Sequence, residues 1–144
     1  MLPKSYILMG IIANNDNEIR IYYSSETSIG KQAYAYVVSS EKKVLGIDVS
    51  KTKVPGSHWA EMAEALNVGI EKLINREHPD FIKHYGNKNI DLDQHDWLRI
   101  LENHPETLAF PIVIMGKKVI KIKTPSDFVK YMELDTRHIE DSNQ

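Results

Sequence analysis

The feature that most constrains the fold is a strand, a helix and a second strand in immediate succession. Glu18 to Tyr23 ("EIRIYY") is rich in β-branched and aromatic residues, as strands are. From Ser28 to about Ser40, apolar residues recur at helical spacing, at Ile29, Ala33, Tyr36 and Val37. Lys43 to Val49 then predicts the next strand. Such a unit joins parallel strands by a right-handed crossover, so the sequence predicts an α/β fold.

The middle of the chain is predicted to be helical. A short helical piece is expected from Ile70 to Ile74. Around it, the predicted helices start at Ser57 as an N-cap, at Pro79 in a first turn and at Asp93 as an N-cap, and they end near Gly69, Gly86 and Pro105.

The two ends of the chain add further strands. Tyr6 to Ala13 is an apolar run that predicts a strand ahead of the Asn/Asp turn. Ile112 to Met115 and Lys118 to Lys123 predict a hairpin around Gly116, and Pro125 to Met132 predicts a last helix. The expected product is one domain, residues 1–144, with a mixed sheet flanked by helices, a helical subdomain at about 54–106 and a flexible tail at 137–144.

Composition excludes several classes of function. The 144 residues include no cysteine, which rules out disulfides, zinc–thiolate sites and thiol catalysis. The net charge of −2 argues against nucleic-acid binding, and no apolar run approaches the length of a membrane span. The six histidines lack zinc-protease spacing, and the acidic stretch Asp91 to Asp96 lacks the glycine of a calcium loop, so no metal is expected. We expect a cytoplasmic protein.

Three stretches together resemble the arsenate reductase and Spx-type family of thioredoxin-fold proteins. They are "IRIYYSSETSIGKQAYAYV", "GIDVSKTKVPGSHWAEMAEALNVGIEKLINR" and "LENHPETLAFPIVIMGKKVIKIKTPSDFVKYM", in the family's order and spacing over residues 18 to 132. The resemblance implies a thioredoxin-like (glutaredoxin-like) α/β fold with a helical insert. The chain is identified as a divergent, cysteine-free member of this family.

The resemblance also implies where a cleft lies. It puts Thr27 at the position of the family's catalytic cysteine, and Gly30 where redox relatives carry a second one. The family's arginines fall at Asn75 or Arg76, at Phe110, and at Thr124 beside Lys123, while Pro111 takes the place of the family's cis-proline. The expected cleft residues are Thr27, Ser28, Gly30, Lys31, Asn75, Arg76, Phe110, Pro111, Lys123 and Thr124.

The residue types argue against the family's chemistry at this cleft. Arsenate reduction needs a thiolate, whereas a threonine hydroxyl has no redox states and attacks only beside a general base. Thr27 and Ser28 could hold an anion at the helix start, but simple N-capping is the favoured interpretation. The "SIGKQ" stretch lacks the residues of a phosphate-binding P-loop. The lysines of the last hairpin are read as a solvated or protected sheet edge rather than an anion site.

Two functions of different classes follow. The leading hypothesis is a non-catalytic protein-binding or regulatory module that has lost the redox cysteine and needs no cofactor. The alternative is a protein that binds glutathione or a small anion, or a glutathione-dependent transferase that uses a hydroxyl in place of the thiol. A structural role through the N-terminal strand pair is a third possibility. The sequence does not fix the partner or the oligomeric state.

Overall fold

The structure, a computed structural model, describes residues 18–86 and 90–132 of the chain. Its elements are, in order, β1 (Glu18–Tyr23), α2 (Ser28–Val38), β2 (Lys43–Asp48), α3 (Gly56–Ala65), η1 (Ile70–Leu73), α4 (Pro79–Tyr85), α5 (Gln94–Asn103), η2 (Pro105–Thr107), β3 (Ile112–Met115) and β4 (Lys118–Lys121). Residues 127–132 are helical. The strand predicted at Tyr6 to Ala13 and the tail predicted at 137–144 lie outside the described residues.

The four strands form one mixed sheet in the order β2-β1-β3-β4. β1 and β2 are parallel, with Tyr23 beside Asp48, while β3 runs antiparallel to both β1 and β4. The predicted parallel pair, the predicted hairpin and the α/β class are therefore confirmed. Because β1 and β3 are antiparallel neighbours, with Tyr22 beside Ile112, the loop that follows β1 lies next to the segment that enters β3.

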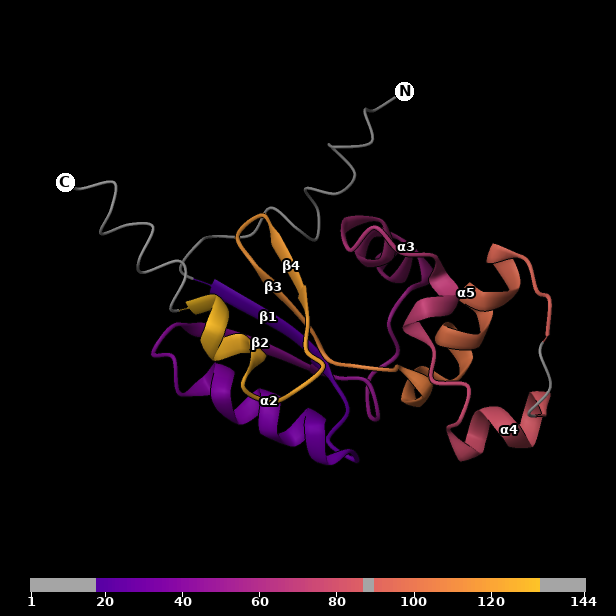
Figure 1. Cartoon of the computed structure of the whole chain (residues 1–144), viewed down its shortest axis with the longest axis horizontal. Helices are drawn as coiled ribbons and strands as arrows, with labels where there is room; N and C mark the ends of the chain where they lie inside the picture. Colours follow the sequence, from indigo (N-terminus) through magenta and orange to yellow (C-terminus); the bar gives the residue numbers. More distant parts are fainter. Residues whose placement is uncertain (1–17, 87–89, 133–144) are drawn as a thin grey trace, which may run out of the picture.

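The side chains of β1 point alternately to the two faces of the sheet and pack into two separate hydrophobic cores. Ile19 and Ile21 face α2 and the helical residues 127–132, where Ala33, Val37 and Phe128 are buried with them. Tyr22 faces the other way, into a core that includes Trp59 of α3, Leu101 of α5 and Ile112 of β3. Figure 1 shows α3, α4 and α5 gathered on one side of the sheet, away from α2. None of the described helices is long and apolar enough to span a membrane.

The start predicted for the α3 helix is wrong by two residues. The helix begins at Gly56, with Pro55 rather than Ser57 at the N-cap position, and no side chain caps it. The carbonyl of Pro55 accepts the N–H of His58 at 3.0 Å. Proline has a fixed φ and no N–H, so it already provides a backbone suited to opening a helix and Ser57 is drawn into the first turn.

The end predicted for α3 near Gly69 is also wrong. The helix stops at Ala65, and Asn67 adopts a left-handed backbone with φ of 58°. Asparagine tolerates this conformation better than most residues, and it ends helices much as glycine does. The predicted start of α5 is correct, because the carboxylate of Asp93 accepts the N–H of Asp96 at 2.8 Å.

Candidate functional site

Thr27 occupies the N-cap of α2, directly after the loop that follows β1. Its hydroxyl donates to the carbonyl of Ser24 at 3.1 Å and accepts the N–H of Gly30 at 3.0 Å. Gly30 is buried against this loop, and a β-carbon there would collide with the carbonyl oxygen of Ser24. The loop therefore closes tightly on the first turn of α2, and a side chain at position 30 would disrupt it.

These two hydrogen bonds determine the chemistry open to Thr27. Its one O–H proton is committed to a backbone carbonyl, and an oxygen lone pair is committed to a backbone N–H. A nucleophilic hydroxyl needs instead a general base that accepts its proton. The contacts match the N-capping interpretation of Thr27 and oppose a nucleophilic one.

The loop is held from the other side by Asp48, at the end of β2. Its carboxylate accepts the backbone N–H groups of Ser25 and Ser50, each at 3.1 Å, and the hydroxyl of Ser50 at 2.7 Å. Partial burial alone would raise the pKa of Asp48, but the hydrogen bonds from Ser25 and Ser50 outweigh burial and lower the pKa to about 2. Asp48 therefore stays ionised and fixes the loop to the neighbouring strand.

A small cleft opens where this loop meets the segment before β3. Its volume is about 130 Å³. It brings together four of the predicted site residues, which are Thr27, Asn75, Phe110 and Pro111. It also contains residues that were not predicted: Ser24, Ile29, His78, Glu106, Leu108 and Ala109.

The unpredicted residues follow from local features of the sequence. His78 directly precedes Pro79 and caps α4, with its Nδ1 accepting the N–H of Asp80 at 3.1 Å. Glu106 lies in η2, whose start Pro105 marks. Asn75 lines the cleft, and its Oδ1 accepts the N–H of Glu77 at 3.0 Å.

Three of the predicted site residues belong to α2 but do not line the cleft. Ser28 is exposed, and its hydroxyl oxygen accepts a hydrogen bond from the Gln32 side chain at 3.0 Å. Lys31 is exposed, and Gly30 is buried within the cap itself. Within α2 and its N-cap, the residues that line the cleft are Ile29 and Thr27.

The predicted cationic residues also lie elsewhere. The Arg76 guanidinium carbon lies 4.6 Å from the centre of the Trp97 ring, which is a cation–π contact on the helical side of the molecule. Lys123 and Thr124 donate their backbone N–H groups to the Asp127 carboxylate at 2.9 and 3.0 Å. Hydrogen bonds from Thr124 contribute most to a lowered pKa of Asp127, and the bond from Lys123 adds to the effect. They also account for a β4 that ends at Lys121 rather than at Lys123 as predicted.

The charge of the cleft does not suit an oxyanion. Neither lysine nor arginine appears among the described residues that line it, whereas Glu106 does. The Glu106 carboxylate lies 3.2 Å from Nδ1 of His104. An arsenate or phosphate group would therefore meet a carboxylate without a compensating guanidinium or ammonium. Within the described residues, no group of three or more acidic or histidine side chains could hold a metal ion.

The backbone beside Pro111 has unused hydrogen-bonding groups. Ala109 donates its N–H to the carbonyl of Leu73 at 2.7 Å, and the carbonyl of Pro111 accepts the N–H of Ile122 at 2.9 Å. Between them, the N–H and C=O of Phe110 bond to no group in the described part of the chain. The peptide bond before Pro111 is trans, so the cis bond implied by the resemblance is wrong. Trans is the intrinsically favoured form before proline.

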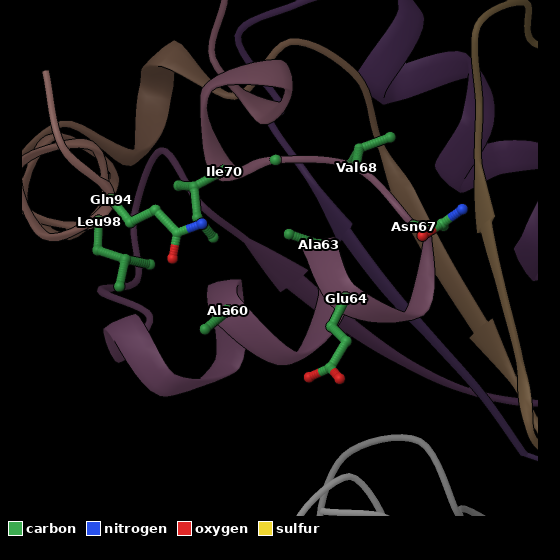
Figure 2. Close-up of a pocket in the computed structure, with 9 residues that line it drawn as sticks. Ala60, Ala63, Glu64, Asn67, Val68, Ile70, Gln94 and Leu98 are labelled. Atoms are coloured by element: carbon green, nitrogen blue, oxygen red, sulfur yellow. The ribbon is translucent and has the colours of Figure 1, made fainter.

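A larger open groove of about 640 Å³ lies between α3, the loop after it and α5. Figure 2 shows Gln94 and Leu98 of α5 pointing toward Ile70, with Ala60 and Ala63 opposite them on α3. Of the nine described residues that line this groove, Glu64 alone is ionisable. None of the predicted site residues is among them. The groove therefore lacks the converging acid and base groups that an active site needs.

No protein-family model matches the chain, and no curated protein matches its sequence. Solved structures do match its fold. A candidate arsenate reductase from Yersinia pestis has a TM-score of 0.68 at 18% identity, over 78% of this chain and 98% of that one. An arsenate reductase from Vibrio cholerae has a TM-score of 0.68 at 13% identity, over 78% of this chain and 96% of that one.

A third structure extends this likeness to another organism. An arsenate reductase related protein from Brucella melitensis has a TM-score of 0.57 at 17% identity, over 80% of this chain and 94% of that one. The mixed sheet order, the flanking helices and these matches agree with one another. The chain therefore has the thioredoxin-like fold of the arsenate reductases and carries it without a cysteine.

Proposed function

We propose that this protein is a non-catalytic binding module whose cleft recognises an extended segment of another protein. The observation that carries this proposal is the unpaired backbone of Phe110, next to a cleft with apolar walls. Extended segments bind proteins by pairing with free backbone groups while a side chain enters an adjacent pocket. Both parts of that arrangement meet at Phe110.

The size of the cleft supports a side chain rather than a cofactor as its occupant. Its volume of about 130 Å³ is well below the several hundred Å³ typical of sites for small molecules and cofactors. Ile29, Leu108, Phe110 and Pro111 supply apolar walls. One aliphatic side chain of a partner segment would bury its surface there, while its own backbone pairs with Phe110.

The charge of the cleft indicates which segments fit. Glu106 is the acidic residue at the cleft, and the described lining residues offer no lysine or arginine to balance an anionic ligand. A neutral or basic segment is therefore favoured over an acidic one. The same charge distribution disfavours arsenate, phosphate and sulfate.

A matched pair of variants tests this proposal. Peptides would be selected from a random display library on the wild-type chain, and their affinities measured by fluorescence. Thr27→Trp and Thr27→Ala both remove the cap, but only Thr27→Trp fills the cleft. We expect Thr27→Ala to keep peptide binding and Thr27→Trp to lose it. Failure to enrich any peptide, or equal binding to both variants, would refute the proposal.

Glutathione is the second candidate ligand, because it is itself an extended peptide that could pair with the free backbone of Phe110. Its two carboxylates count against it, since the described cleft residues include no lysine or arginine to meet them. A glutathione titration on the same two variants distinguishes the candidates. Binding of glutathione that Thr27→Trp abolishes would favour the second function over the first.

A further inference from the structure

Within the described part of the chain, β2 is an outer strand of the sheet, and its outer edge pairs with no other strand. The N–H of Val49 donates to the carbonyl of Tyr23 on β1 at 2.8 Å. Along a parallel strand, the backbone N–H and C=O groups of successive residues point alternately to one neighbouring strand and to the other side. The odd-numbered residues of β2, like Val49, therefore point these groups toward β1. Val44 and Gly46 therefore point their N–H and C=O groups outward. Among residues 18–86 and 90–132, no group bonds to these outward N–H and C=O groups.

The two edges of the sheet differ in how they are protected. β4, at the other edge, carries Lys118 and Lys121 within a strand of four residues. Lysines on short edge strands discourage pairing with other chains. β2 is longer and has only Lys43, at its first position. Leu45 in its middle is 46% exposed. The β2 edge is therefore the one suited to adding another strand.

On the face of the sheet opposite the Leu45 side chain, the aromatic ring of Tyr34 lies against β2. A β-carbon at Gly46 would lie 2.6 Å from Cε2 of Tyr34, so the glycine lets this ring lie against the edge strand. The Tyr34 ring stacks on that of Tyr23, with centroids 4.6 Å apart. An added strand with a β-branched residue opposite Gly46 would pack that residue beside Tyr34, a favourable cross-strand combination.

We propose that a second copy of this chain pairs antiparallel along β2, with Leu45 opposite the partner subunit's Leu45. Val44 then lies opposite the partner subunit's Gly46, and the outward backbone groups of both strands bond to each other. The two exposed leucines cover one another on one face, while Val44 lies beside the Tyr34 ring of the partner subunit on the other. A two-fold interface needs only one self-complementary patch, which is what this edge offers.

The alternating faces of a strand leave few registers for such a pair, because opposite residues must share a face. A register shifted to place Gly46 at the axis would set Val44 opposite the partner subunit's Asp48. The Asp48 carbonyl already accepts the N–H groups of Lys51 and Thr52, at 3.0 and 2.9 Å. The Leu45-centred register therefore forms more complete hydrogen bonding. It joins the two four-stranded sheets into one continuous sheet.

Cross-linking tests this register directly, because the native chain has no cysteine. Residues opposite each other in a non-hydrogen-bonded antiparallel pair have Cα atoms about 4.5 Å apart, which a disulfide can bridge. Leu45→Cys should therefore form a covalent dimer under mild oxidation. The matched control is Ile82→Cys on α4, where the native side chain is 39% exposed. Cross-linking of Leu45→Cys no faster than that of Ile82→Cys would overturn the proposal.

Charge pairing provides the second test, by sedimentation velocity over a wide dilution series. Leu45→Lys and Leu45→Glu each place like charges opposite one another and should weaken self-association by more than about tenfold. An equimolar mixture of the two variants should restore the dimer, because the opposed charges are then complementary. Ile82→Lys should leave association unchanged. A monomeric wild type, or a mixture that stays monomeric, would contradict the Leu45-centred pair.

Discussion

The hydroxyl oxygen of Thr27 accepts the backbone N–H of Gly30 at 3.0 Å, at the first turn of α2. The same hydroxyl donates to the carbonyl of Ser24. At the position where the resemblance implies a catalytic cysteine, the chain therefore carries a helix cap. Because both the donor and the acceptor of this hydroxyl are used within the fold, Thr27 stabilises the folded state. Its replacement should therefore lower the free energy of unfolding.

Thr27→Ala should lower the free energy of unfolding by about 1 kcal/mol, because the N–H of Gly30 loses its partner. Thr27→Ser keeps the hydroxyl and should cost less than half as much. Urea denaturation monitored by circular dichroism measures both. Equal losses for the two variants would show that the methyl group, rather than the cap, stabilises the loop.

Gly30→Ala should destabilise the fold by about 1–3 kcal/mol, although alanine is the better helix former. The reason is the collision of a β-carbon with the carbonyl oxygen of Ser24. The matched control is Ala35→Gly in the exposed middle of the same helix, which should cost about 1 kcal/mol from helix propensity alone. A Gly30→Ala variant as stable as the wild type would contradict the close approach of loop and helix.

Thr27→Cys should not produce arsenate reductase activity. The variant would gain a thiol at the helix start, yet the described cleft residues would still include no lysine or arginine to bind the oxyanion, and the acidic Glu106 would disfavour it. A coupled reductase assay measures turnover, and thiol titration confirms that the introduced group is reduced and accessible. Turnover well above that of the wild type would show that the cleft binds arsenate after all.

Asp48 should make the fold sensitive to acid. Its pKa is about 2 in the folded protein, below its ordinary value near 3.8 in an unfolded chain. Because the pKa is lower in the folded state, ionised Asp48 stabilises the fold at pH values above the unfolded-state pKa. That stabilisation is lost as the pH falls from about 4 to about 2. Because the carboxylate is only partly buried, solvent screening limits the contribution to about 1 kcal/mol.

Asp48→Asn should therefore be less stable than the wild type at neutral pH, and the gap should narrow below pH 4. Urea denaturation at a series of pH values gives the difference in unfolding free energy. Glu41→Gln, at an exposed loop position, is the control and should show no comparable gap at neutral pH. A difference between wild type and Asp48→Asn that stays constant across the acid range would contradict the assigned pKa.

Arg76→Ala should lower stability by about 0.5–1 kcal/mol and leave peptide binding at the cleft unchanged. The loss follows from the cation–π contact with Trp97, which is 4% exposed. Arg76→Lys should retain part of that stability because an ammonium group also interacts with the ring. Peptide affinity that falls with Arg76→Ala would place this side chain at the cleft instead.

The fold was largely predictable because periodic patterns decide it. β1, α2, β2 and the hairpin of β3 and β4 each follow from local spacing of apolar residues, and the parallel pair follows from the rule for crossovers. The boundaries of α3 were less predictable, since a proline at its start and a left-handed asparagine after its end replaced the expected signals.

The cleft was only partly predictable because side-chain contacts depend on tertiary structure. Thr27, Phe110 and Pro111 were placed there by the resemblance, and they do line one cleft. Arg76 contacts the Trp97 ring, which is distant in sequence, and no local pattern predicts such a contact. Glu106 lies in a short turn without periodicity, so no pattern of residues indicated that it lines the cleft.

The proposed binding function predicts that this cleft, in the thioredoxin-like fold of the arsenate reductases, does not bind oxyanions. Thermal shift with arsenate, phosphate and sulfate, each in large excess, measures such binding. A ligand at a hundred times its dissociation constant adds about 2.7 kcal/mol, which should raise the midpoint by several degrees. We predict no shift with any of the three anions. A shift of several degrees that disappears in Thr27→Trp would show that the cleft binds oxyanions.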